Sequence, residues 1–323
     1  MPVLFRCAGI ALAVIPAFLL LLRAASGAAA EDQPAQTFRE WQVLDAHAGR
    51  PIALDDLLAQ LATQDVIYLG EEHRNRSHIE AALKILQGLL GKQRQPVLAL
   101  EMLSWDGQTG LDRYLSDASL SRTDFLRESR WEENWGGPFE DYEPLIAFAR
   151  DHGLSVLALN PPRPLVRLVA SKGMTQALSD PEMSRWGMTD VSFPEDAAYR
   201  EMIVKPLRQC HGGLSDQAYQ RMYDAAAFRD EGMARTIAER LRAPGHAPGP
   251  IVSYTGGGHV QYQLPVPNRV VRRIGGPVKQ TSIYMTAFDP DRSEEIREYM
   301  RDGIADYVWL TPPGAQGMPR RCK

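Results

Sequence analysis

Two Gly-x-x-His motifs, each at the end of a short apolar run, carry the residue types best suited to chemistry. Gly70-Glu71-Glu72-His73 follows the run Val66 to Leu69, and Gly256-Gly257-Gly258-His259 follows the run Ile251 to Tyr254. Imidazoles and carboxylates together suit either a divalent transition metal or proton transfer. Glycines beside both histidines let the backbone come close to a ligand. We therefore predict that His73 and His259 share a functional site with Glu71 and Glu72.

Two more apolar runs end in polar residues. Val97 to Leu100 is followed by Glu101, and Ser155 to Leu159 is followed by Asn160 and then Arg163. Because ligands of a parallel sheet bind beyond the carboxyl ends of its strands, we expect these side chains beside the two histidines. Arg163 offers a two-pronged contact to a ligand carboxylate, or a salt bridge to an acid of the site.

Some residues near these motifs have more than one reading. His78 lies one turn into the helix after the first motif, where we expect a neutral, solvated surface histidine. Trp131 and Trp135 belong to a glycine-rich aromatic stretch that either walls an apolar ligand or packs in the core. The charges of Arg229 to Ala234 either solvate a long helix or reach the site.

The order of the elements indicates an α/β fold. Apolar runs at Ser282 to Ala287 and Tyr307 to Leu310 predict two more buried strands. A capping box, Ser77-His78-Ile79-Glu80, begins a helix whose apolar face we expect at Ile79, Leu83, Leu86 and Leu90. Further helices are predicted at Ser121 to Arg130, Tyr142 to His152, Pro164 to Lys172 and Ser215 to Leu241. Alternating strands and helices predict a mainly parallel sheet with helices on both faces.

One region departs from this alternation. Met174 to Cys210 is helix-prone but irregular, and we interpret it as an inserted helical lobe, of a kind that caps a site at the edge of a sheet. It lies inside a single predicted domain that spans residues 31–311, and residues 312–323 are expected to form a mobile tail.

The N-terminus has the features of a secretory signal peptide over residues 1–30. An apolar run from Ala8 to Leu22 is followed by Arg23 and then by small residues, and it is shorter than the roughly 20 residues that a membrane span needs. Cys7 precedes the run and follows Arg6, so we expect no lipid anchor to be attached there. We therefore expect an exported protein, periplasmic or otherwise extracytoplasmic.

The cysteines and the net charge further limit the possible functions. The mature chain would keep Cys210 and Cys322, which either pair in an oxidising compartment or are unrelated. The formal net charge is -4, with both signs mixed along the chain. Because nucleic-acid binding calls for a basic patch or stripe, we expect no nucleic-acid partner.

The motifs, taken in order, resemble those of the ChaN-type haem-binding uptake proteins, within the larger group that includes the Tiki proteases and the erythromycin esterases. The resemblance covers about residues 65 to 268. It is carried by Tyr68 to His73 with His78, Leu100 to Met102, Trp131 to Ala149, Leu157 to Asn160, Arg229 to Ala234, and Gly256 to Val260 with Val266-Pro267.

The resemblance implies two functions. ChaN-like proteins bind haem in iron acquisition, often as outer-membrane lipoproteins, from which the position of Cys7 departs. In that case Arg163 would meet a propionate, Tyr142 is a candidate iron ligand, and a haem receptor or transporter and a homodimer are conceivable partners. The Tiki-like branch instead implies a divalent-metal-dependent hydrolase that uses His73, His259 and Glu101, with a metal-activated water. The residues leave carrier and enzyme open.

Overall fold

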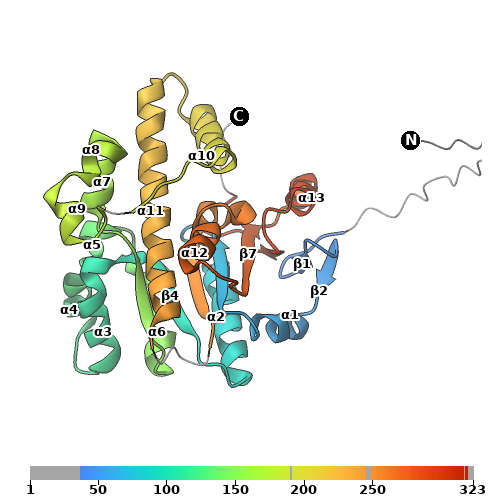
Figure 1. The fold of residues 1–323 in the computed structure, drawn as a ribbon. Coiled ribbons are helices and arrows are strands. Elements are labelled where there is room, and N and C mark those ends of the chain that lie inside the picture. The colour runs from blue at the N-terminus through green and yellow to red at the C-terminus, as the bar shows by residue number, and fades with distance from the viewer. Residues whose placement is uncertain (1–36, 190, 245–248, 316, 319–323) are drawn as a thin grey trace, which may run out of the picture. The chain divides into compact units, whose positions relative to one another are not determined.

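The computed structural model describes residues 37–189, 191–244, 249–315 and 317–318. Its centre is an eight-stranded sheet in the order β2-β1-β8-β7-β3-β6-β4-β5, with helices on both faces (Figure 1). The strands are β1 (Val43–Asp45), β2 (Arg50–Ile52), β3 (Val66–Glu71), β4 (Val97–Ser104), β5 (Val156–Asn160), β6 (Ile251–Gly256), β7 (Gln280–Ala287) and β8 (Tyr307–Thr311).

The sheet is mainly parallel, which confirms the predicted fold class. The six strands from β3 to β8 run parallel to one another, whereas β1 pairs antiparallel with both β8 and β2. Each predicted apolar run is a strand, and Val97 to Leu100 extends through Glu101 to Ser104. The sequence did not reveal β1 and β2, because each has three residues and β2 contains Pro51 and lies at an exposed edge.

Alternate side chains of each strand enter different cores. Ile67 and Leu69 of β3 pack under the first group of helices, while Val66 and Tyr68 pack under the long helix α11. The first group is α1 (Leu54–Leu61), α2 (Arg76–Gly91), α3 (Gln108–Ser116), α4 (Arg122–Glu128), α5 (Trp131–Asn134) and α6 (Glu143–Asp151). Opposite them lie α11 (Asp216–Arg242), α12 (Val266–Ile274) and α13 (Ser293–Asp302). Burial on both faces explains why the strands are continuously apolar.

Helix α2 begins earlier than the capping box predicts. Its N-cap is Asn75, whose side chain accepts a hydrogen bond from the backbone N–H of Ser77 at 3.0 Å. Ser77 is therefore a residue of the first turn and the predicted cap is wrong, because an asparagine two residues earlier satisfies the same orphan donors. The buried face contains Ile79 and Leu86 as expected, but Leu83 and Leu90 are only half-buried.

The described part of residues 174–210 contains three helices joined by irregular segments, in line with the helix-prone but irregular lobe expected there. The helices are α8 (Met174–Leu178), α9 (Pro181–Arg185) and α10 (Ala197–Cys210), which follow α7 (Arg163–Lys172). Met183 and Phe228 share one small core where the lobe meets α11, and Tyr199 and Tyr223 share another between α10 and α11. Figure 1 shows α10 beside the far end of α11, beyond the edge of the sheet.

Several predictions about the ends of the chain fall outside the described residues. The signal peptide at 1–30 is among them, and so is Cys322, although Cys210 at the end of α10 is disulfide-bonded. Within the described ranges, no helix has the length and apolar character needed to cross a membrane.

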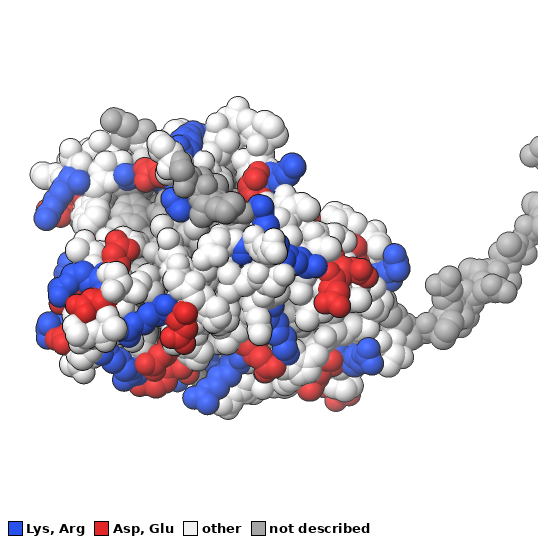
Figure 2. All heavy atoms as spheres, turned by 90° about the horizontal axis from the view of Figure 1, so that it is seen from below, with Lys and Arg blue, Asp and Glu red and all other residues white. Residues whose placement is uncertain are grey.

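The surface carries both charge signs. Figure 2 shows one face of the molecule, on which Lys and Arg lie next to Asp and Glu rather than in separate fields. Such a mixed surface agrees with the charge pattern of the sequence.

Candidate functional site

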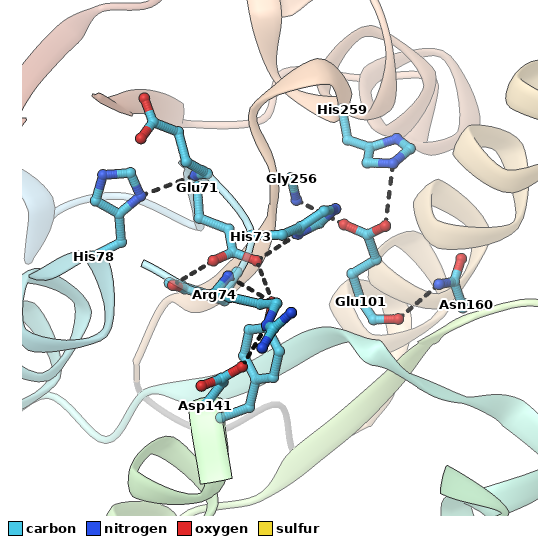
Figure 3. Close-up of polar contacts among 12 residues, drawn as sticks. Glu71, His73, Arg74, His78, Glu101, Asp141, Asn160, Gly256 and His259 are labelled. Carbon is cyan, nitrogen blue, oxygen red and sulfur yellow. Dashed lines mark hydrogen bonds and ion pairs between the residues drawn. The ribbon is translucent and has the colours of Figure 1, made fainter. Parts of the chain in front are cut away.

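The two Gly-x-x-His motifs lie side by side at the carboxyl edge of the sheet. Strand β6 pairs with β3 on one side and with β4 on the other, and Glu71 is in register with Gly256. The end of β3 therefore places His73 next to the end of β6, and β4 brings Glu101 to the same edge (Figure 3). This is the position at which parallel α/β sheets bind ligands.

His73 is held by a buried carboxylate. Its Nδ1 lies 2.7 Å from Oε1 of Glu71, whose side chain is fully buried, while the His73 side chain is 47% exposed. The hydroxyls of Tyr142 and Tyr254 also donate to Glu71, at 3.0 and 2.9 Å. Trp135 meets the imidazole edge to face, with ring centroids 5.1 Å apart. The ring orientation of His73 is thus fixed, and its Nε2 points away from the carboxylate of Glu71.

His259 lies between two carboxylates. Its Nδ1 is 2.5 Å from Oδ1 of Asp230, on α11, and its Nε2 is 3.3 Å from Oε1 of Glu101. Asp230 also accepts a hydrogen bond from Tyr199, at 2.5 Å. Burial alone would lower the pKa of His259, but the charges of Glu101 and Asp230 outweigh it and raise the pKa to about 9. His259 is therefore a cation at neutral pH.

The carboxylate of Glu101 has three partners in the site. It accepts the backbone N–H of Gly256 at 2.6 Å and pairs with the guanidinium of Arg229 as well as with His259. Burial would raise the pKa of Glu101, but His259 and Arg229 hold it well below its usual value. Asn160 adds a hydrogen bond to the Glu101 carbonyl at 2.6 Å and accepts one from Arg229 at 3.3 Å. Glu101 is accordingly an ionised group with its acceptors occupied.

The pKa of His73 is raised. Burial opposes the charged form, but the hydrogen bond to Glu71 and the charge of Glu101 outweigh it. Both histidines of the site therefore favour the imidazolium more than an isolated histidine does, and each one has its own carboxylate partner at Nδ1.

A pocket of about 760 Å³ opens over the histidine pair. The pocket is lined by Gly256 to Gly258, by Ile203 of α10 and by Ala226 of α11. Gly314, Gly317 and Met318, near the described end of the chain, also line it. The predicted helical lobe thus contributes to the pocket through α10, and part of the segment predicted to be a mobile tail lines it.

Glu72 and His78 do not take part in the contacts that join Glu71, Glu101 and Asp230 to the two site histidines. Glu72 lines the pocket, but its carboxylate turns to Thr286 and to the backbone N–H of Ala287, at 2.9 and 3.0 Å. Its pKa is raised by burial despite these hydrogen bonds. His78 was expected at the surface and is instead fully buried, where its Nδ1 accepts the backbone N–H of Glu72 at 2.9 Å.

The correction for His78 has a physical reason. Burial lowers its pKa to about 3, so the ring is neutral, as expected, but because it is buried rather than because of the helix dipole. The neutral ring holds the turn that ends in His73, since it accepts from the residue just before it.

The aromatic residues predicted to wall the pocket divide into two groups. Trp131 is 3% exposed, donates to the carbonyl of Gly137 and belongs to the core under α4 to α6. Tyr142 is fully buried, with its hydroxyl between Glu71 and the backbone N–H of Arg74, so the structure does not present it to the pocket as an iron ligand. Trp135 contacts the site through the ring of His73, and Tyr142 contacts it through its hydrogen bond to Glu71.

Arg163 lies in a second, smaller cavity of about 240 Å³. This cavity is lined by Trp135, Asn160 and Arg229 among others, and Glu101 forms part of its wall. Arg163 is exposed, and its backbone N–H donates to Asn134 at 3.0 Å. Asn160 therefore contacts the site through its hydrogen bond to the Glu101 carbonyl, whereas Arg163 does not lie beside His73 and His259.

Sequence reasoning missed Tyr199 and Tyr254 as parts of this site, and it left Asp230 undecided. The segment from Arg229 to Ala234 had been left between a solvating and a site role, and the structure shows that Arg229 and Asp230 reach the site. Two adjacent charges in the middle of an apolar helix face were the available signal. Tyr254 gave none, because a tyrosine in a buried strand is typical of a core.

The predicted metal-ligand set of His73, His259 and Glu101 is not supported. Within the part of the chain that the structure describes, no group of three or more His, Cys, Asp or Glu side chains is arranged to hold a metal ion. The physical reason lies at Glu101, whose oxygens already accept from Gly256, Arg229 and His259.

Fold and site together define a ligand-binding α/β protein with a histidine and carboxylate pocket at the sheet edge. The family model for haem-binding uptake proteins of the Tiki superfamily, ChaN, matches residues 57–270, and the chain belongs to this family.

The chain is similar to several proteins of known sequence or structure, and the first of those named here shares its fold. The ChaN protein of Campylobacter jejuni, whose structure is described as showing cofacial haem binding, has a TM-score of 0.64 at 17% identity and covers 85% of this chain and 98% of its own. Protein RETICULATA-RELATED 5, chloroplastic, of Arabidopsis thaliana is 27% identical over 280 residues. The match takes in 81% of this chain but only 36% of that relative's length. An erythromycin esterase in its open conformation has a TM-score of 0.42 at 13% identity over 72% of each chain.

Proposed function

We propose that this protein binds haem in the 760 Å³ pocket at the carboxyl edge of the sheet and serves haem or iron uptake. The observation that carries the proposal is this pocket, which a half-exposed histidine with a carboxylate at its Nδ1 lines. Its volume lies within the range of roughly 300 to 1,000 Å³ that small-molecule and cofactor sites occupy. Membership of a haem-binding family supports the same ligand.

The lining suits a flat, largely apolar ligand with acidic edges. Glycine backbone at Gly256 to Gly258 and the side chains of Ile203 and Ala226 provide walls without charge. Arg74 lines the same pocket and is 45% exposed; its Nε pairs with Asp141 at 2.8 Å, and the outer nitrogens of its guanidinium would meet a propionate. When bound, haem would supply its iron as the group that the pocket's donors hold.

A haemin titration tests this function. We expect the purified chain to shift and sharpen the Soret band with saturation near one haem per site, because the pocket removes haemin from water and aggregates. Replacing Ala226 by Phe, which fills part of the pocket, should weaken binding by about tenfold or more, equivalent to roughly 1.4 kcal/mol. A Soret spectrum identical to that of haemin in buffer would refute haem binding.

A second candidate is hydrolysis of a carbonyl compound. It is favoured by one observation: both histidines hold a carboxylate at Nδ1, which is the arrangement of an oriented general base, and His259 is cationic. In this function His73 would take a proton from water while His259 polarises the carbonyl. Turnover of chromogenic esters by the haem-free protein, with and without added divalent metal and lost in His73→Ala, would establish it.

Export is a separate proposal. The apolar run and small residues of the first 30 positions support a cleaved signal peptide and an extracytoplasmic location, where a haem receptor or transporter would be the partner and a homodimer a compatible state. Fractionation of cells and N-terminal sequencing of the extracted protein test this, with a new N-terminus near residue 31 as the expected outcome.

A further inference from the structure

The second cavity, of about 240 Å³, carries a positive charge that the surrounding side chains do not balance. Its charged lining residues are Glu101, Arg163 and Arg229. Glu101 pairs with the guanidinium of Arg229, so these two charges offset each other. The charge of Arg163 is left over, and an anion in the cavity would neutralise it.

Arg163 has no carboxylate partner among the described residues. Its backbone N–H donates to Asn134, and its guanidinium makes one long hydrogen bond, from Nη1 to the backbone carbonyl of Glu133 at 3.5 Å. The carboxylates of Glu133 and Asp106 both pair with Arg130 instead. An unpaired guanidinium offers a planar fork of donors that matches the two oxygens of a carboxylate.

The start of α7 adds to the same positive field. Arg163 is the first of the ten residues of this helix, and Pro161, Arg163 and Val166 at its start all line the cavity. The first turn contains no acidic residue, and no side chain caps it. The positive end of the helix dipole therefore lies beside the cavity and favours an anion there.

Arg229 offers a second donor to the same ligand. Its Nε bonds to Asn160 and its Nη2 to Glu101, whereas Nη1 makes no hydrogen bond within the described part of the chain. The side chain is 30% exposed. The guanidinium is thus held in place while one of its nitrogens stays available.

The rest of the lining indicates which anion fits. The apolar contributors are Met102, Trp135, Pro161 and Val166. The neutral polar contributors already bond within the protein, and they are Ser104, Asn134 and Asn160. Apolar walls suit a carbon chain, and a single unbalanced charge suits a monoanion better than a dianion such as phosphate.

We propose that the second cavity binds a small monocarboxylate, with its carboxylate on Arg163 at the start of α7, Nη1 of Arg229 as a further donor, and its carbon chain on the apolar walls. The volume is below the roughly 300 to 1,000 Å³ of typical ligand pockets, so the ligand has only a few carbon atoms. This cavity shares no lining residue with the 760 Å³ pocket, so the site does not depend on haem binding.

Butyrate is the probe that tests the ligand class. We expect it to shift the indole ¹⁵N–¹H NMR signal of Trp135, assigned with Trp135→Phe, in a saturable way at constant ionic strength. 1-Butanol has a similar size but no charge, and phosphate has a higher charge but no carbon chain. Both should bind about tenfold more weakly than butyrate or worse, because each lacks one of the two contacts.

Variants on α7 test the role of Arg163. Arg163→Gln keeps a polar side chain but removes the charge, and it should weaken butyrate binding by about fivefold or more. Arg167→Gln makes the same change at an exposed arginine one turn further along α7, outside the cavity lining, and should bind butyrate as the wild type does. Circular dichroism of each variant checks its fold.

Each contrary outcome overturns a definite part of the proposal. Absence of a saturable shift in the wild type, or equal affinity in Arg163→Gln, would refute the site. Equal weakening in both variants would show that the net charge of the protein attracts butyrate rather than Arg163. Equal binding of 1-butanol, or tighter binding of phosphate, would refute a monocarboxylate as the ligand.

Discussion

At the scale of single residues, the site balances buried charges of opposite sign. His259 and Arg229 are cations that meet the carboxylates of Glu101 and Asp230 in a space largely closed to water. Each carboxylate has more than one donor, so removing a single partner leaves a buried charge incompletely compensated. The pKa of His259 therefore reports on the balance of charges in this cluster.

Asp230→Asn should lower the pKa of His259 from about 9, because the variant removes one of the two carboxylate charges that raise it. The measurement is an NMR titration of the imidazole protons. Asp216→Asn, at a side chain that is 89% exposed, is the control and should leave the titration unchanged. An unaltered pKa in Asp230→Asn would show that Asp230 does not set the charge of His259.

The sequence predicts those site residues whose position follows from the sheet alone. His73, Glu101 and His259 could be brought together because polar residues after parallel strands meet at one edge. The position of Asp230 could not be predicted in this way, because the packing of α11 across the sheet decides which of its residues face that edge. The burial of His78 was also unpredictable, because a histidine in a first helical turn gives no sign of which side is covered.

At the scale of elements, the glycines after β6 set the distance between backbone and side chains. A Cβ at Gly256 would lie 2.9 Å from Cε1 of His73 and 3.5 Å from Glu101, whereas a Cβ at Gly258 would meet nothing within 4 Å. The motif therefore contains two positions, Gly256 and Gly257, where an added Cβ would meet a close neighbour, and one, Gly258, where it would not.

Gly256→Ala should displace His73 and weaken haemin binding by about 10- to 100-fold, which corresponds to the roughly 1 to 3 kcal/mol that overpacking typically costs. Gly258→Ala carries the same substitution two residues away and should bind as the wild type does. Binding constants from Soret titrations provide the comparison. Equal affinities for the two variants would contradict the close approach at Gly256.

The strands and long helices were predictable because their apolar patterns are strong. Ser121 and Ser215, for example, were expected to start helices, and both are N-caps whose side chains accept backbone N–H groups. The short strands β1 and β2 were not predictable, since three residues show no period and their pairing with β8 is a long-range event.

At the scale of the whole molecule, buried His78 couples folding to pH. Its pKa is about 3 in the folded chain, below the ordinary histidine pKa of about 6.5, so between these pH values only the unfolded chain takes up the proton. Stability from this residue is therefore complete above pH 6.5 and is lost as the pH falls towards 3, by about 1.4 kcal/mol per pH unit.

His78→Asn should reduce this acid sensitivity. Asparagine can still accept from the Glu72 N–H but does not titrate, so the loss of unfolding free energy between pH 7 and pH 5 should be smaller than in the wild type. Urea unfolding at both pH values measures the difference. His152→Asn is the control at an exposed position, and an identical loss in His78→Asn and wild type would rule out the buried histidine as the cause.

The position of β6 between β3 and β4 has a consequence for the folding of the newly synthesised chain. Glu71 and Tyr254 are 183 residues apart in the chain, and Glu101 and Gly256 are 155 apart, yet both pairs are hydrogen-bonded. Strand β6 must therefore insert between β3 and β4 after most of the chain has been synthesised, and contacts of such sequence separation form slowly. A nascent chain that ends before residue 251 already contains His73, Glu71 and Glu101 but lacks the strand that joins them. A chain truncated before residue 251 is therefore expected to lack the pocket in which we propose that haem binds.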